Sequence, residues 1–213
     1  MAPSYKDRGL IPHPMRYRRS CLPNSRNEVA FDTRPGIERP MLFGINLRAS
    51  GDATPYWELV ERAAALEVEP TIHALDYPPH ITLAKYADAD PQELQAVVTD
   101  LSAMRPLKIS FDRIGAFDSG SLILWASPKP HEGLLDLHNQ VHTRIDPGRC
   151  KPPYRPDNWT PHCSIALRVA DHHREAANRM RAADFTPFVL TFDVVDCVSS
   201  PPIAVIAERA LTG

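Results

Sequence analysis

From Leu42 onward, short apolar runs alternate with amphipathic stretches, which is the pattern of a domain that mixes strands and helices. Strands are predicted near 42–48, 107–117, 121–127, 188–197 and 202–209. Four helices are predicted. The first begins at Pro55 and has Trp57, Val60 and Ala64 on one face, and the second follows an N-cap at Asp90 and buries Leu94, Val97, Val98 and Leu101. The third is marked by Leu134, Leu137, Val141 and Ile145, and the fourth runs from an N-cap at Asp171 to about Ala182. The pattern therefore predicts an α+β fold.

The second part of this pattern repeats the first. The octapeptide Tyr-Pro-Pro-His-Ile-Thr-Leu-Ala at 77–84 matches Trp-Thr-Pro-His-Cys-Ser-Ile-Ala at 159–166, and Ile-Ser-Phe-Asp at 109–112 matches Leu-Thr-Phe-Asp at 190–193. We interpret segments of about 77–127 and 159–209 as two repeats that pair about a pseudo-twofold axis, because neither could close a core alone. The two octapeptides are then expected to face each other.

Each octapeptide carries the motif His-x-(Thr/Ser) after a proline, as His80 with Thr82 and His162 with Ser164. Alternate side chains of a strand share a face, so each copy presents an imidazole and a hydroxyl to one cavity. One histidine could remove a proton from an attacking oxygen while the other protonates the leaving oxygen, with the hydroxyls holding phosphate. Composition alone predicts roughly a tenth of one Pro-His-x-(Ser/Thr) match. The structural alternative is a pair of ordinary buried histidines. Alternation turns Lys85 away from this cavity.

Charge and cysteine content narrow the functional class. The formal net charge of −2 provides no global basic field for holding long duplex DNA, so any nucleic-acid contact must be local. Residues 1–40 hold six prolines and eight Lys or Arg residues, but only four acidic residues. We interpret this segment as a flexible basic arm, or alternatively as a tail that binds RNA, and we expect the folded domain to span 41–213. Four scattered cysteines and the lack of a long apolar run predict a soluble cytoplasmic protein with no membrane contact, and we expect a monomer.

The Pro-His-Ile-Thr-Leu and Pro-His-Cys-Ser-Ile pair resembles the 2H phosphoesterase superfamily, which includes 2′-5′ RNA ligase-like proteins and cyclic nucleotide phosphodiesterases. The resemblance covers about Met41 to Leu211. It implies a bilobal fold in which two antiparallel sheets line a central groove with helices outside. It also implies metal-free acid–base catalysis by His80 and His162, with Thr82 and Ser164 binding phosphate and no cofactor.

The expected activity is hydrolysis of 2′,3′-cyclic phosphates of small nucleotides or RNA ends. Two alternatives stay open: cleavage or ligation of 2′-5′ linkages by the same acid–base pair, and a non-catalytic protein that binds RNA ends. The sequence does not select among RNA ends, small cyclic nucleotides and ADP-ribose cyclic phosphate, and does not say which histidine is the base.

The segment 149–159 before the second motif combines cations with aromatic rings. Tyr154, Arg155 and Trp159 are candidates for base stacking and phosphate steering, although prolines and aromatic residues also simply order long loops. His138 and His142 have the i, i+4 spacing of a metal pair, but no further ligand at suitable spacing completes a site, so no metal is expected.

Overall fold

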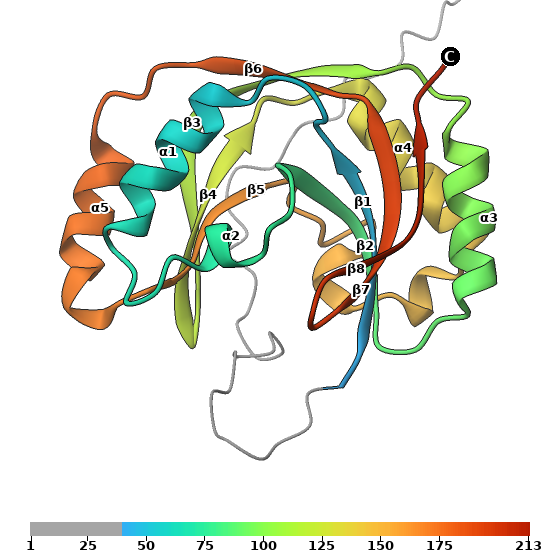
Figure 1. Ribbon diagram of the computed structural model, residues 1–213, viewed down its shortest axis with the longest axis horizontal. Coiled ribbons are helices and arrows are strands. Elements are labelled where there is room, and N and C mark those ends of the chain that lie inside the picture. The colour runs from blue at the N-terminus through green and yellow to red at the C-terminus, as the bar shows by residue number, and fades with distance from the viewer. Residues whose placement is uncertain (1–39) are drawn as a thin grey trace, which may run out of the picture.

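Eight strands form two four-stranded antiparallel sheets in the computed structural model, which describes residues 40–213 (Figure 1). The first sheet has the order β2 (His80–Tyr86), β1 (Leu42–Arg48), β7 (Val194–Ser200), β8 (Ala204–Ala210). The second has the order β5 (Cys163–Val169), β4 (Ser121–Pro128), β3 (Leu107–Ser119), β6 (Phe188–Phe192). The predicted α+β class and the two antiparallel sheets are confirmed.

Helices cover both sheets on their outer sides (Figure 1). Helices α3 (Pro91–Leu101) and α4 (Glu132–Arg144) contact the first sheet, whereas α1 (Thr54–Ala64), α2 (Thr71–Ala74) and α5 (Arg174–Ala182) contact the second. Three short 3-10 turns complete the elements: η1 (Pro147–Arg149), η2 (Pro152–Tyr154) and η3 (Asp171–His173). Buried apolar side chains from both sheets form one continuous cluster.

The prediction of one strand over 188–197 is wrong. The chain leaves the second sheet after β6 and enters the first as β7, with Asp193 at the crossing. The Asp193 N–H donates to the Arg48 carbonyl at 3.1 Å, and its carboxylate accepts from the N–H and hydroxyl of Ser50. In the first repeat the matching residue, Asp112, lies in β3 where the pairing partner changes from β6 to β4. The repeated Phe-Asp pair thus marks where each copy changes partner.

The helix predictions were partly right. Asp90 caps α3 as expected, its carboxylate accepting from the Gln92 N–H. The buried face of α1 is formed by Tyr56, Leu59, Val60 and Ala63, so it is rotated relative to the predicted stripe of Trp57, Val60 and Ala64. Asp171 is not the N-cap of α5: it opens η3, and its carboxylate accepts from the Arg174 side chain.

The predicted basic arm lies outside the described residues apart from Pro40. Within the part of the chain that is described, none of the helices has the length and apolar character needed to cross a membrane.

Candidate active site

The two motif strands are the edge strands of their sheets, and they contact each other. The Tyr56 hydroxyl of α1 donates to the Ser164 carbonyl at 2.7 Å. On the other strand, the indole N–H of Trp159 donates to the Thr82 carbonyl at 3.0 Å. Each motif strand is thus held by a hydrogen bond from a side chain outside its sheet. The contact between β2 and β5 agrees with the prediction that the two motifs face each other.

The two histidines are held in the same way. His80 Nδ1 lies 2.9 Å from the Pro78 carbonyl oxygen, and His162 Nδ1 lies 2.7 Å from the Thr160 carbonyl oxygen. A carbonyl can only accept, so Nδ1 carries the proton in both rings and the lone pair of each neutral imidazole is on Nε2. Each motif thus fixes its histidine in the tautomer that can take up a proton at Nε2.

Burial controls the charge of His80. Desolvation, together with the charges of His162 and Lys85, lowers the pKa of His80 to about 4, although the bond to the Pro78 carbonyl acts in the opposite direction. His80 is therefore neutral at pH 7, the state required of a general base.

Aromatic rings flank both imidazoles. The Tyr77 ring meets His80 edge-on at 4.8 Å between centroids. The Phe117 ring meets His162 edge-on at 5.0 Å, and Trp125 lies 5.9 Å from it. The rings restrict both imidazoles to one orientation.

A buried polar network lies beside the first motif, formed by Thr82, Asn46, Tyr77, Asp196 and Arg48. The Thr82 hydroxyl donates to Asn46 Oδ1 at 2.9 Å, and the Asn46 amide donates to Asp196 Oδ1 at 3.2 Å. Tyr77 donates to the same carboxylate, and Arg48 Nε lies 2.9 Å from it. Asp196 is fully buried, and this desolvation raises its pKa despite these partners. The carboxylate fixes the Asn46 amide, which in turn fixes the Thr82 hydroxyl.

The second half of the site is not equivalent. Asn46 lies opposite Thr82 and Asp196 in the first sheet, whereas Trp125 lies opposite Ser164 and Gly115 in the second. A Cβ atom on Gly115 would lie 2.3 to 2.5 Å from three indole atoms of Trp125, so glycine is required there. Within residues 40–213 the Ser164 hydroxyl has no hydrogen-bond partner, so it is free to donate to a ligand, while the Thr82 proton already bonds to Asn46.

A β-bulge corrects the expected position of Lys85. Asn46 pairs with Thr82 but Ile45 pairs with Ala84, so β2 contains one extra residue, Leu83. The bulge reverses the alternation, and the partly buried residues of β2 are His80, Thr82 and Lys85. Lys85 therefore lies on the side of His80, which explains its effect on the pKa of that residue. The second motif has the same bulge at Ile165.

Glu67 holds the corresponding part of β5. Glu67 is buried, with 8% of the residue exposed. Its carboxylate accepts from the N–H and hydroxyl of Thr71, and from the N–H groups of Leu167 and Arg168 at 2.9 and 2.7 Å. These last two donors belong to the edge of the second sheet, which has no neighbouring strand. The carboxylate thus completes the hydrogen bonding of the motif strand.

The segment 150–159 lies along the edge of β2. Trp159 stacks on His138 at 3.9 Å, and the Arg155 guanidinium donates to the carbonyls of Cys150 and Gly148. The Tyr154 carbonyl accepts from Nε2 of both His138 and His142, at 2.9 and 3.0 Å, so these two histidines anchor a loop. A substrate role for Tyr154, Arg155 and Trp159 stays a prediction.

Sequence reasoning missed Asn46, Tyr77 and Asp196, and assigned Lys85 to the wrong side. Asn46 gave a signal: it is a polar residue inside the apolar segment 42–48. The bulge gave none, because Leu83 and Ala84 are both apolar whichever way the strand turns.

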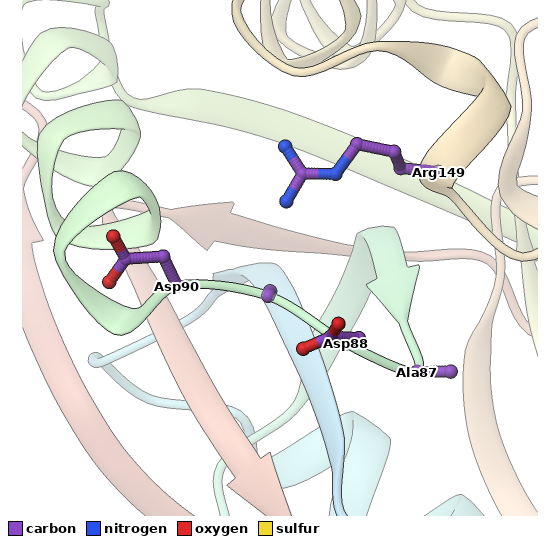
Figure 2. Close-up of a pocket in the computed structure, with 5 residues that line it drawn as sticks. Ala87, Asp88, Asp90 and Arg149 are labelled. Carbon is purple, nitrogen blue, oxygen red and sulfur yellow. The ribbon is translucent and has the colours of Figure 1, made fainter.

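A cavity of about 570 Å³ lies at the end of β2, lined by Ala87, Asp88, Ala89, Asp90 and Arg149 (Figure 2). The Arg149 guanidinium is bonded to Glu93 at 2.8 Å. The cavity contains none of the motif residues.

Comparison with known proteins agrees with this geometry. Residues 54–201 match the family model described as the 2′-5′ RNA ligase superfamily. The chain belongs to the 2′-5′ RNA ligase superfamily. Two proteins from Bacillus cereus strains, whose names place them among phosphoesterases without a substrate, are 25% identical over 113 residues. That alignment covers 51% of this chain and 63% of theirs, so the chain spans less than two thirds of the length of these curated relatives.

Solved structures with the superfamily fold include LigT from E. coli. Its apo form has a TM-score of 0.52 at 14% identity, and its complex with NADP+ has a TM-score of 0.50 at 16% identity. Each match covers 83% of this chain and 100% of LigT. The likeness confirms the fold of the superfamily for this chain.

Proposed function

We propose that this protein is a metal-independent phosphodiesterase that opens 2′,3′-cyclic phosphates of nucleotides or RNA ends. The observation that carries the proposal is the matched pair of imidazoles on contacting strands, each donating Nδ1–H to the carbonyl two residues earlier. That arrangement provides two Nε2 atoms for proton transfer around one phosphorus. Membership of the superfamily supports phosphoesterase activity.

In the proposed reaction a water oxygen bonds to phosphorus and the bond from phosphorus to the 2′ or 3′ oxygen breaks. His80, which is neutral at pH 7, suits removal of the water proton, and His162 in its protonated form then protonates the departing oxygen. The product is a phosphomonoester. In this proposal the Ser164 hydroxyl donates to a phosphate oxygen, and Thr82, whose hydroxyl donates to Asn46, binds the phosphate from the first motif.

Nucleotide substrates are consistent with the structures that share the fold. LigT is found in complexes with NADP+ and with 3′-AMP. We infer a nucleotide or an RNA end as the ligand here.

The test is turnover of a nucleoside 2′,3′-cyclic phosphate in the presence of EDTA. His80→Ala and His162→Ala should each lower kcat by about 10²–10⁴-fold, the usual contribution of a general acid or base. His172→Ala is the matched control, because His172 is an exposed histidine of η3. Full activity in either motif variant, or loss of wild-type activity on chelation, would contradict the proposal.

Product analysis separates the alternatives. Turnover of 2′-5′-linked dinucleotides but not of cyclic phosphates would assign the site to 2′-5′ linkages. Tight binding of both without turnover would make the protein a non-catalytic binder of RNA ends.

A further inference from the structure

Two lysines face each other beside the first motif. Tyr86 pairs with Cys150 in an antiparallel bridge, and the Lys151 N–H donates to the Lys85 carbonyl at 2.8 Å, so Lys85 and Lys151 lie directly opposite each other. Directly opposite residues project to the same side. Tyr86 and Cys150 are buried on the other side, and both lysines are partly buried.

This arrangement is unfavourable unless an anion compensates it. Like charges directly opposite on neighbouring strands destabilise the pairing. Burial and the charge of Lys151 lower the pKa of Lys85. In the described part of the chain neither lysine forms an ion pair, whereas the nearby Arg149 is paired with Glu93.

The lysine pair is close to the reacting groups. The bulge at Leu83 turns Lys85 to the side of His80 and Thr82, and its charge acts on His80. Lys85 follows His80 by five positions along the strand, which is roughly 15 Å between Cα atoms. The long lysine side chain can reach back over part of this distance. An anion held by the lysines would therefore lie next to, and not at, the phosphorus between the histidines.

We propose that Lys85 and Lys151 bind a second, unreacting phosphate of the substrate, attached on the 5′ side of the nucleoside that carries the cyclic phosphate. This proposal rests on the proposed function and narrows its substrate class. The 2′,3′ and 5′ oxygens lie on opposite sides of a ribose, so a nucleoside seated with its cyclic phosphate at the histidines directs its 5′ oxygen away from them. The 5′ phosphate can be a monoester or the internucleotide diester of an RNA end.

Three substrates separate these possibilities: adenosine 2′,3′-cyclic phosphate, its 5′-phosphorylated form, and the dinucleotide ApA with a terminal cyclic phosphate. Wild type should show a higher kcat/KM for a substrate with the second phosphate, and the advantage should shrink as salt rises. Lys85→Gln and Lys151→Gln should each lower kcat/KM for that substrate about tenfold more than for the mononucleotide. If the lysine variants lose kcat/KM only with the 5′-phosphorylated mononucleotide, the substrate is a 5′-phosphorylated nucleotide. If they lose kcat/KM with the dinucleotide, the substrate is an RNA end.

Lys108→Gln is the matched control, because Lys108 is an exposed lysine of β3. Equal losses with all three substrates in the Lys85 and Lys151 variants would overturn the proposal, since the lysines would then act on the reacting phosphate or on the fold.

Binding distinguishes failure of this proposal from failure of the proposed function. Calorimetry with adenosine 3′,5′-bisphosphate and with 3′-AMP requires no turnover. If the second phosphate strengthens binding in wild type and not in the double variant, the subsite stands even when no cyclic phosphate is hydrolysed. If it gives no advantage in wild type, the subsite proposal is wrong whatever the activity.

Discussion

Replacement of Glu67 by glutamine tests whether one carboxylate stabilises the second motif strand. In the wild type Glu67 Oε1 accepts from the Thr71 hydroxyl and from the N–H groups of Leu167 and Arg168, and Oε2 accepts from the Thr71 N–H. Glutamine keeps one oxygen for three of these donors but turns an amide N–H toward the fourth. The substitution therefore removes charge without removing volume.

The magnitude follows from the four bonds. Hydrogen bonds to a charged group contribute about 1.5–3 kcal/mol each, against about 0.5–1.5 for neutral pairs, and a buried unsatisfied donor costs about 1–3. Weakening three bonds by about 1–1.5 kcal/mol each and leaving one donor without an acceptor lowers the free energy of unfolding by about 4–7 kcal/mol. Since domains are typically stable by about 5–15 kcal/mol, this loss removes a large part of the total stability and is readily measured.

Urea unfolding followed by circular dichroism measures the difference. The control is Glu61→Gln, because the Glu61 side chain is 77% exposed and should change stability by less than about 0.5 kcal/mol. A loss of less than about 1 kcal/mol for Glu67→Gln would show that water, and not the carboxylate, satisfies the strand edge.

Three further predictions concern the same surroundings. Burial lowers the pKa of His138 to about 4, below the unfolded value of about 6.5. As pH drops from 6.5 to 4 the unfolded chain therefore binds a proton that the folded chain does not, and the free energy of unfolding should fall by up to about 3 kcal/mol. Urea unfolding at several pH values should show that this free energy depends less steeply on pH in His138→Gln, and an unchanged dependence would contradict the assignment. Gly115→Ala should cost about 2–3 kcal/mol and shift the fluorescence of Trp125, since the new methyl group overlaps the indole; unchanged stability and emission would refute the close contact. Trp159→Phe keeps the stack on His138 but loses the bond to the Thr82 carbonyl, so the free energy of unfolding should fall by about 1 kcal/mol and kcat should also fall. A wild-type kcat in this variant would show that the bond from Trp159 does not contribute to catalysis.

The repeat made much of this site predictable from sequence. Two copies of one motif at a constant offset require similar strands, and similar strands at two sheet edges can meet. What the pattern could not show was local: Leu83 and Ile165 are apolar like their neighbours, so nothing in the sequence distinguishes a bulged residue from a paired one. Asp193 was likewise hidden in an apparently continuous strand, because whether a chain stays in one sheet depends on partners elsewhere, here Arg48 and Ser50.

The partners of the Asp196 network also lie beyond local pattern. Asn46 and Asp196 are 150 residues apart in the chain, and no rule of spacing links a polar residue in an early strand to an acid in a late one. Their contact depends on β7 lying beside β1, which is a property of the whole topology.

The place of β7 beside β1 has a consequence for how the protein is made. While the chain leaves the ribosome, β1 and β2 have only each other as partners until residues 194–210 emerge, and an isolated pair of strands is marginally stable. The first sheet is therefore completed last although two of its strands, β1 and β2, are synthesised early, and pairings over such separations form slowly. A frameshift or stop codon after β6 would leave no smaller working protein, only a chain with an uncovered apolar sheet face for quality-control proteases.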